Sequence, residues 1–265
     1  MSLRAAVTRR LLAALLVGGL VAGAGQARAD ALADIKKAGV LNVGVFEDFP
    51  PFSSVSTDMS LRGYDIDVAN ALGKALGVKV KLVAVTGQNR IPSLIEHKVD
   101  ILLSVGQSAE REKVIDFTAA YAPYYIAAIG PKALKVASAA DLAGKTVAVN
   151  RGTLEDTSLT EAAPKTADIK RFDNYNGVIT AFLSGQVQLI VVGNDVGASV
   201  LSKKPALEPE QKFQLMSSPD HIALNKNEPA FKQLLDATVA QMKTDGSLNA
   251  ISQQWLGKPL DPKDL

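Results

Sequence analysis

The stretch "DVANALGKALGVKVKLVAV" (residues 67–85) places a helical pattern directly before a strand pattern. Over 67–77 the apolar side chains recur at helical spacing, and Gly77 provides a C-terminal stop signal. Residues 78–85 then alternate between polar and apolar side chains, which is typical of a strand. The same alternation of elements predicts a strand at 40–45, a short helix at 90–98 and a buried strand at 99–104. Together they predict an α/β unit with a mostly parallel sheet and helices on its faces.

A second α/β pattern begins after this first unit. Its predicted strands and helices are 124–130, 145–150, a helix from Leu154, 168–172, a helix at 178–183, and 187–193. The apolar stretch 221–226 then predicts a strand, and a helical pattern follows it from Pro229. The simplest architecture that fits this order of elements has two α/β lobes joined by two crossings. A cleft between lobes is a common place for a small ligand. The predicted division is a signal at 1–29, lobe 1 at 30–125 and 221–265, and lobe 2 at 126–220.

The first 29 residues have the order of a secretory signal. Arg4, Arg9 and Arg10 precede an apolar stretch from Leu11 to Gly25, and a small-x-small site follows at 27–29. The apolar stretch has about 15 residues, fewer than the roughly 20 that a membrane span requires. An uncleaved anchor is the alternative, and a lipid anchor on cysteine is excluded because the sequence has no cysteine. We therefore expect a protein that is exported to the periplasm and released in soluble form.

Charge and composition exclude several classes of function. Without residues 1–29 the chain has 25 basic and 27 acidic residues, a net charge of −2, so neither nucleic acid nor an anionic membrane is an expected partner. The lack of cysteine excludes disulfides, thiol catalysis and thiolate metal sites. Two histidines argue against a zinc site, and no G-x-S-x-G motif supports serine hydrolysis. We expect no metal and no prosthetic group.

Two stretches have patterns that suit an anionic ligand. In "LLSVGQSAEREKVIDFT" (102–118) a turn is predicted at 105–106, and Ser108 is predicted to cap a short helix that carries Arg111. The guanidinium fork of Arg111 suits a carboxylate, whereas a surface ion pair with a neighbouring glutamate is the alternative. In "AVNRGTLED" (148–156) a strand turns through Gly152 into a helix, whose exposed amides also suit an anion.

Five stretches, taken in order, make the chain resemble a known family. They are "LNVGVFEDFPPF" (41–52), "LRGYDIDVANALGKALG" (61–77), "VDILLSVGQSAEREKVIDFTAAY" (99–121), "LAGKTVAVNRGTLED" (142–156) and "MKTDGSLNAISQQWLG" (242–257). The chain resembles the polar-amino-acid branch of the periplasmic solute-binding proteins that feed ABC importers. This resemblance implies the two-lobed type II fold and a monomer that closes on a small amino acid or related carboxylate. It also implies docking on an inner-membrane permease whose ATPase supplies the energy.

The resemblance also implies a set of ligand-binding residues. They are Phe49, Tyr64, Ser104, Gly106, Arg111, Thr153, Leu154 and Asp195. In the family, the aromatic residues at the positions of Phe49 and Tyr64 sandwich the ligand, and the arginine at the position of Arg111 takes its α-carboxylate. Packing in the core of the first lobe is the alternative for Phe49 and Tyr64. By the same resemblance, Thr153 contributes its hydroxyl and Leu154 its backbone N–H to that carboxylate.

The chain departs from the family at the positions that hold the ligand's ammonium group. Gly106 stands where the family usually has a serine or threonine, and Gly193 stands where it usually has an aspartate. A buried ammonium without a carboxylate is costly. Either Asp195, Glu47 or Asp48 replaces the missing partner, or the ligand has no ordinary α-ammonium group.

Other residues near the predicted aromatic pair have different expected roles. Phe46 occupies a position where binders of basic amino acids tend to have an acid, which counts against lysine, arginine or histidine as ligand. Phe52 is expected to pack in the core, and Asp65 and Asp67 are expected to cap the helix that follows them.

Two further functions are compatible with the same fold. The family includes dehydratases of cyclic prephenate-like acids, for which His221 and Glu155 are the candidate acid–base residues. His221 is more simply a hinge residue, and Glu155 more simply an acid in the first turn of a helix. A receptor that reports to a chemosensor is the other alternative, since transport and signalling can use the same closed form.

Overall fold

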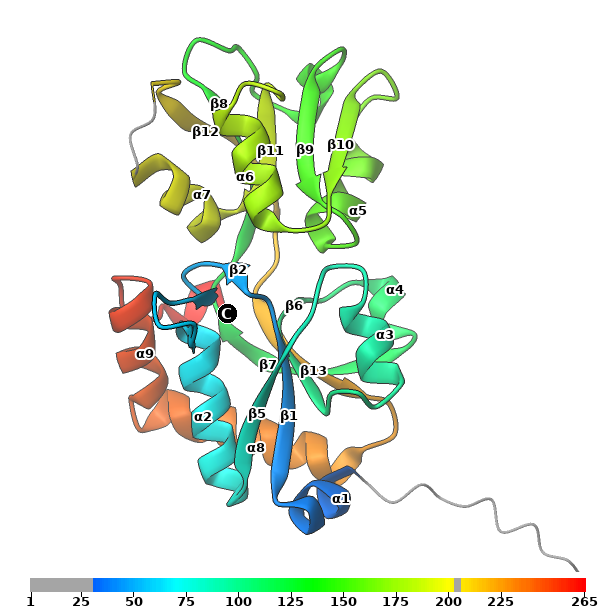
Figure 1. The fold of residues 1–265 in the computed structure, drawn as a ribbon, viewed down its shortest axis with the longest axis vertical. Coiled ribbons are helices and arrows are strands. Elements are labelled where there is room, and N and C mark those ends of the chain that lie inside the picture. Colours follow the sequence, from blue (N-terminus) through cyan, green and yellow to red (C-terminus); the bar gives the residue numbers. More distant parts are fainter. Residues whose placement is uncertain (1–30, 203–205) are drawn as a thin grey trace, which may run out of the picture.

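The computed structural model describes residues 31–202 and 206–265, and these residues form two α/β lobes (Figure 1). The signal predicted at 1–29 lies outside the described residues. Within the described ranges, no helix is both long and apolar enough to cross a membrane.

The sheet of the first lobe has the strand order β5-β1-β6-β13-β7. Its strands are β5 (Lys79–Ala84), β1 (Val40–Val45), β6 (Ile101–Gly106), β13 (Asp220–Asn225) and β7 (Ile115–Ala122). Strands β5, β1 and β6 are parallel, as the alternating pattern predicts, whereas β13 runs antiparallel to both of its neighbours. A strand from the end of the chain therefore lies between two strands from its first half.

Helices cover both faces of this sheet (Figure 1). They are α1 (Ala31–Ala38), α2 (Tyr64–Leu76), α3 (Arg90–Ile95), α4 (Ala109–Glu112), α8 (Pro229–Thr244), α9 (Ser247–Trp255) and the 3-10 turn η2 (Pro262–Asp264). Helix α2 starts earlier than predicted, with Gly63 as its N-cap, and ends at Gly77 in the left-handed conformation, as predicted. The capping roles predicted for Asp65 and Asp67 are wrong. Asp65 turns into the core, and Asp67 accepts a hydrogen bond of 2.6 Å from Nε1 of Trp255.

The sheet of the second lobe has the order β10-β9-β11-β8-β12. Its strands are β10 (Asp168–Phe172), β9 (Thr146–Asn150), β11 (Leu189–Gly193), β8 (Tyr125–Pro131) and β12 (Pro209–Ser217). The helical segments of this lobe are η1 (Ala139–Leu142), α5 (Leu154–Ala162), α6 (Tyr175–Leu183) and α7 (Asn194–Ser202). Strands β10, β9 and β11 are parallel, and β8 is antiparallel to both β11 and β12.

A small three-stranded sheet extends the first lobe toward the second. It consists of β2 (Asp48–Phe49), β3 (Ser53–Val55) and β4 (Leu61–Arg62). The link from β2 to β3 contains Pro50 and Pro51, so Phe49 and Phe52 are held on either side of a rigid turn.

The chain crosses between the lobes twice, and the two crossings touch. The first crossing, at Pro123 and Tyr124, joins β7 to β8, and the second, at Ser218 and Pro219, joins β12 to β13. The backbone N–H of Ser218 donates a hydrogen bond of 3.0 Å to the carbonyl oxygen of Tyr124. The paired crossings form a two-stranded connection between the lobes, an arrangement also found in proteins that close about a hinge.

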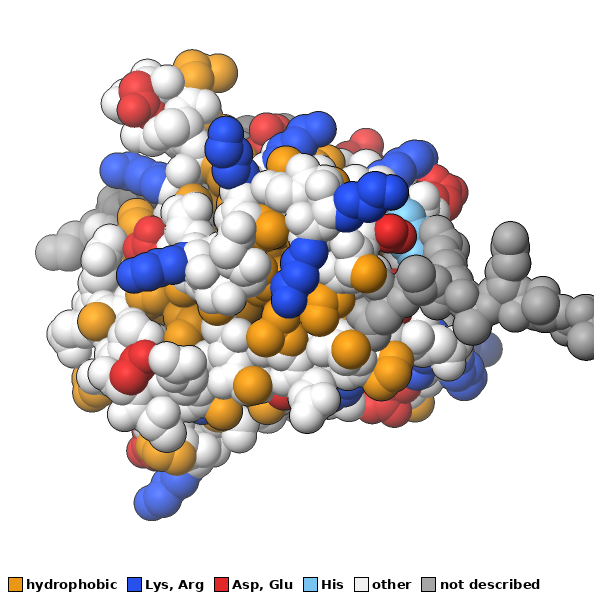
Figure 2. Space-filling view, turned by 90° about the horizontal axis from the view of Figure 1, so that it is seen from below, with side chains coloured by type: hydrophobic (Ala, Val, Ile, Leu, Met, Phe, Trp, Pro, Cys, Tyr) orange, Lys and Arg blue, Asp and Glu red, His pale blue; other side chains and the backbone are white. Residues whose placement is uncertain are grey.

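On the face seen from below, positively and negatively charged side chains are mixed. Figure 2 shows Lys and Arg side chains spread among acidic and uncharged ones, with hydrophobic atoms visible near the centre. The mixture of charges on this face agrees with the nearly balanced composition.

Candidate ligand-binding site

Arg111 is positioned by the strand and helix that the sequence suggested. Ser108 caps α4, since its Oγ accepts the N–H of Arg111 at 3.3 Å, and the predicted cap is confirmed. The turn predicted at Val105 and Gly106 is wrong, because both residues extend β6 and pair with β13. The side chain of Arg111 is buried, and its Nη1 donates a 2.8 Å hydrogen bond to the carbonyl oxygen of Gly106.

Arg111 is a buried cation without an ion pair among the described residues. The neighbouring Glu110 binds Lys113 at 2.7 Å instead. Burial, and to a smaller extent the charge of Arg90, lowers the pKa of Arg111 to about 9, while Glu155 acts in the opposite direction. The guanidinium still carries its charge at neutral pH, so this position suits an anion.

A cavity of about 750 Å³ opens beside Arg111 at the interface of the lobes. The first lobe contributes Gln107, Ser108 and Arg111 to its lining, and the second contributes residues of α5 and its N-terminal turn, among them Gly152 and Leu154. The predicted carboxylate-binding arginine and the predicted anion-binding helix start therefore lie on opposite walls of one cavity.

The hydroxyl of Thr153 has a partner within the second lobe. Its Oγ1 donates a 2.7 Å hydrogen bond to the carbonyl oxygen of Asn150, which commits its proton. Thr153 is the N-cap of α5, and the first N–H groups of a helix, here starting at Leu154, have no partner within the helix. Leu154 is the first residue of α5 and lines the cavity, and the predicted role of its amide stays a prediction. A donor role for the Thr153 hydroxyl requires that hydroxyl to turn.

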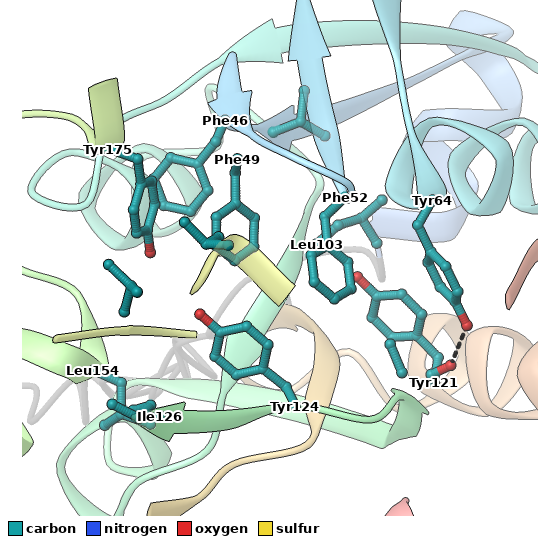
Figure 3. Packing of buried hydrophobic residues seen from close by; sticks show 14 of the residues in the cluster. Phe46, Phe49, Phe52, Tyr64, Leu103, Tyr121, Tyr124, Ile126, Leu154 and Tyr175 are labelled. Atoms are coloured by element: carbon teal, nitrogen blue, oxygen red, sulfur yellow. Dashed lines mark hydrogen bonds between the residues drawn. The ribbon is translucent and has the colours of Figure 1, made fainter. Parts of the chain in front are cut away.

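Next to this cavity, an aromatic cluster occupies part of the space between the lobes (Figure 3). Phe49 stacks on Tyr175 of the second lobe at 4.7 Å between centroids and on Phe52 at 5.2 Å. Phe52 in turn lies 5.7 Å from the ring of Tyr64, so it occupies the space between the two rings predicted to sandwich a ligand. A ligand can enter between Phe49 and Tyr64 only if Phe52 moves.

Tyr64 and Ser104 belong to a buried polar network in the first lobe. The hydroxyl of Tyr64 donates to the carbonyl oxygen of Tyr121 at 2.8 Å (Figure 3). Ser104 Oγ donates to Asp65 at 2.7 Å, and the hydroxyl of Tyr121 also donates to Asp65. The carbonyl oxygen of Ser104 accepts from Nη1 of Arg90 at 2.9 Å. Ser104 therefore orients Arg90 and holds Asp65, and its predicted contact with ligand stays a prediction.

The pKa of Asp65 predicts a pH dependence of stability. Burial raises this pKa from 3.8 to about 6, against the opposing effects of the Tyr121 and Ser104 hydroxyls and the charge of Arg90. The folded protein thus holds this proton more tightly than the unfolded chain does. The stabilisation is fully present below pH 3.8 and is lost as the pH rises through about 6.

Between about pH 4 and about pH 7, the wild type should lose up to ~3 kcal/mol of stability relative to Asp65→Asn. Urea unfolding of both proteins across this range measures the difference. A difference that stays constant with pH would show that Asp65 has an ordinary pKa.

Glu155 and two tyrosines form a second buried network, on the wall of the second lobe. The Oε1 of Glu155 accepts hydrogen bonds from the hydroxyls of Tyr124 at 2.7 Å and Tyr175 at 3.1 Å. The ring of Tyr124 lies over Gly193, where a Cβ would meet its hydroxyl oxygen at 1.9 Å. The place where the family usually has an aspartate side chain is therefore filled by Tyr124.

Two of the acids proposed for an ammonium group, Asp195 and Asp48, have partners of their own. Asp195 accepts from Nδ2 of Asn194 at 2.9 Å, and burial raises its pKa although the charge of Lys258 opposes this. Asp48 accepts the backbone N–H of Asn176 at 2.7 Å, which links the small sheet to the N-terminus of α6 across the lobes. Asp48 thus contributes to the contact between lobes, and Asp195 stays a predicted ligand residue.

Sequence reasoning did not identify two of the buried charges near the hinge. Arg90 is buried at the start of α3, with its guanidinium 5.1 Å from the centre of the Phe46 ring. Asp220 is buried at the start of β13. One feature of the sequence could have identified Asp220, because it is a charged residue that directly precedes the apolar strand predicted after the second crossing. No local pattern distinguished Arg90 from an exposed helix residue.

Comparisons with known proteins agree with this arrangement. The family model described as bacterial extracellular solute-binding proteins, family 3, matches residues 41–258. The glutamate/aspartate import solute-binding protein of Salmonella typhimurium is 29% identical over 281 residues, which cover 97% of this chain and 91% of that protein. The ABC transporter arginine-binding protein 1 of Escherichia coli is 28% identical, and the match covers 81% of this chain and 90% of that protein.

Solved structures show the same fold. An ancestral arginine-binding protein bound to arginine has a TM-score of 0.79 and 30% identity, covering 83% of this chain and 99% of that one. The ancestral amino acid-binding protein AncCDT-1, described as a precursor of cyclohexadienyl dehydratase, has a TM-score of 0.78 and 31% identity. That match covers 86% of this chain and 99% of the other.

Proposed function

Since this chain belongs to the bacterial extracellular solute-binding proteins, family 3, we propose that it captures an amino acid or related carboxylate for an ABC importer. Arg111 carries the proposal, because it is a buried cation without an ion pair in the described part of the chain and it lines a cavity between the lobes. A ligand carboxylate supplies the missing partner through the bidentate geometry of the guanidinium.

The ligand's side chain is proposed to be neutral or acidic. Phe46 packs against Phe49 and Tyr175, and the guanidinium of Arg90 lies over its ring. This wall offers an apolar surface and a positive charge, which disfavours a cationic side chain. Relatives of this chain are named for glutamate and aspartate, and also for cystine, arginine and glutamine, so family membership alone leaves the side chain open.

The protein is proposed to bind its ligand and to release it unchanged. Glu155, the candidate acid for a dehydratase, is occupied by two tyrosine hydroxyls. His221 contacts the carbonyl oxygen of Thr118 through Nδ1 at 2.8 Å, in keeping with a structural position in β13. The relatives named above are binding and import proteins.

Closure of the lobes is the proposed working motion. Asp48 and Asn176, and the stacked rings of Phe49 and Tyr175, join the two lobes on one side of the hinge. A ligand that binds both Arg111 and the start of α5 would favour this closed arrangement over an open one. We propose that the closed monomer acts in the periplasm and docks on an inner-membrane permease driven by its ATPase.

A thermal-shift screen of the purified protein tests this proposal. The ligands are the amino acids, their decarboxylated amines and simple carboxylates, and the mass of each hit is measured after incubation to detect turnover. A ligand that binds only the folded state stabilises it by about 2.7 kcal/mol at a hundredfold excess over Kd. We expect shifts with one or a few amino acids or carboxylates and no change in ligand mass. Shifts with amines alone, or conversion of the ligand, would refute the proposal.

A further inference from the structure

Two polar side chains at and next to the second crossing are buried, and each has an oxygen without a hydrogen-bond partner in the described structure. Ser218 is 5% exposed and Asp220 is 2% exposed. The Oγ of Ser218 and the Oδ2 of Asp220 have no partner among the described residues. Leaving such groups unsatisfied is costly, so their retention at the hinge requires an explanation.

Gly106 opens the space that Ser218 occupies. Gly106 pairs with Asp220 in the register of β6 and β13. A Cβ on Gly106 would lie 2.3 Å from Ser218 Oγ and 2.7 Å from Cδ2 of Leu154. A serine or threonine at position 106 would therefore collide with Ser218, and its hydroxyl is replaced by that of Ser218, which comes from the second crossing.

This polar pair lies beside the carboxylate-binding arginine. The carbonyl oxygen of Gly106 accepts the 2.8 Å hydrogen bond from Arg111, and the Cα of Gly106 faces Ser218. In an amino acid the carboxylate and the ammonium group are attached to the same carbon. The side chains that bind the carboxylate and the ammonium group must therefore lie next to each other. Arg111, Ser218 and Asp220 all lie next to Gly106.

The electrostatics around Asp220 favour a cation. Burial, the nearby carboxyl of Asp65 and, more weakly, Glu155 and Asp195 all raise the pKa of Asp220, whereas the charge of Arg90 lowers it. The charge of Arg111 also interacts favourably with Asp220. Arg90 and Asp220 form no ion pair within the described residues. An added positive charge would stabilise the ionised form of Asp220 and pair with it.

We propose that Asp220 and Ser218 bind the ammonium group of the ligand whose carboxylate is bound by Arg111. Asp220 supplies the negative charge, and Ser218 Oγ supplies a hydrogen-bond acceptor. These two side chains replace the hydroxyl and the carboxylate that Gly106 and Gly193 lack. The inference rests on the proposed function and makes it more specific, since it requires a ligand with a free α-amino group.

The test compares amino acids that shift the wild type with their deaminated carboxylates, on wild type, Asp220→Asn and Ser218→Ala. Calorimetry gives the affinities. We expect Asp220→Asn to weaken amino-acid binding by roughly 30-fold or more, as for removal of one partner of a buried charge pair. Ser218→Ala should weaken it by about 3- to 10-fold, as for one hydrogen bond. Binding of the deaminated compounds should change much less in both variants.

Two further variants serve as controls. Asp116→Asn alters an aspartate opposite the other end of β13, where it pairs with Lys226 at 2.7 Å, and should leave affinity unchanged. Asp195→Asn tests the rival acid.

The inference is overturned if the wild type binds amino acids and Asp220→Asn and Ser218→Ala bind them equally well, or if Asp195→Asn alone removes the preference for an amino group. A wild type that binds none of the panel would instead refute the proposed function. Ser218→Ala, which removes one oxygen, decides the outcome if Asp220→Asn does not fold.

Discussion

Replacing Arg111 by alanine is expected to reduce affinity for the ligand by about 2–5 kcal/mol, or roughly 30-fold to several thousand-fold. Arg111 is buried at the wall of the cavity and forms no ion pair within the described chain. A ligand carboxylate bound there is out of bulk water, so the loss of its partner leaves a buried charge unpaired. The effect should fall mainly on the dissociation rate.

Titration calorimetry of wild type, Arg111→Ala and Arg111→Lys with the best ligand measures the effect. Lysine keeps the charge but lacks the planar fork, so it should restore only part of the affinity. Arg62→Ala, at an exposed position in β4, is the matched control and should bind like the wild type. Equal affinity of Arg111→Ala and wild type would exclude Arg111 as the carboxylate anchor.

Gly193→Ala is expected to destabilise the protein by about 3 kcal/mol, at the upper end of the range for overpacked cores. The new methyl group would lie 1.9–2.1 Å from three atoms of the Tyr124 side chain. Tyr124 cannot easily withdraw, because its hydroxyl is bound by Glu155 and its ring packs against Phe49 and Phe52.

A double-mutant cycle measures this contact directly. In a Tyr124→Ala background the ring is absent, and Gly193→Ala should then cost less than about 1 kcal/mol. Gly197→Ala provides a comparison within the same lobe, since its Cβ would meet its nearest atom, the flexible end of Ile129, at 3.1 Å. If Gly193→Ala is equally costly with and without Tyr124, the ring does not fill this position.

The sequence predicted most strands and helices because their signals are local. Alternation over 78–85 and helical spacing over 67–77 each depend on a few neighbouring residues, and both segments fold as predicted. The errors concern residues whose environment is set by distant parts of the chain. Val105 and Gly106 have the composition of a turn, but pairing with β13 makes them a strand. Asp65 has the position of a capping residue, but Ser104 and Tyr121 draw it into the core.

The site was predictable only where a motif marks it. Arg111 and Leu154 follow recognisable strand-to-helix turns, and the structure places both on one cavity. Arg90 and Asp220 acquire their importance through burial against residues 14 or more positions away in sequence, Ser104 for Arg90 and Gly106 for Asp220. No pattern within a single element reveals that burial.

The central position of β13 determines when the first lobe can form. This strand lies between β6 and β7, yet it begins only at Asp220, after the whole second lobe has been synthesised. A growing chain therefore cannot complete its first sheet until it is nearly full length, and the contacts that close the sheet span about 100 residues or more. Such non-local pairing slows folding. For export in an unfolded state, which the predicted signal implies, this order of strands delays folding, because the sheet of the first lobe stays incomplete until synthesis is almost finished.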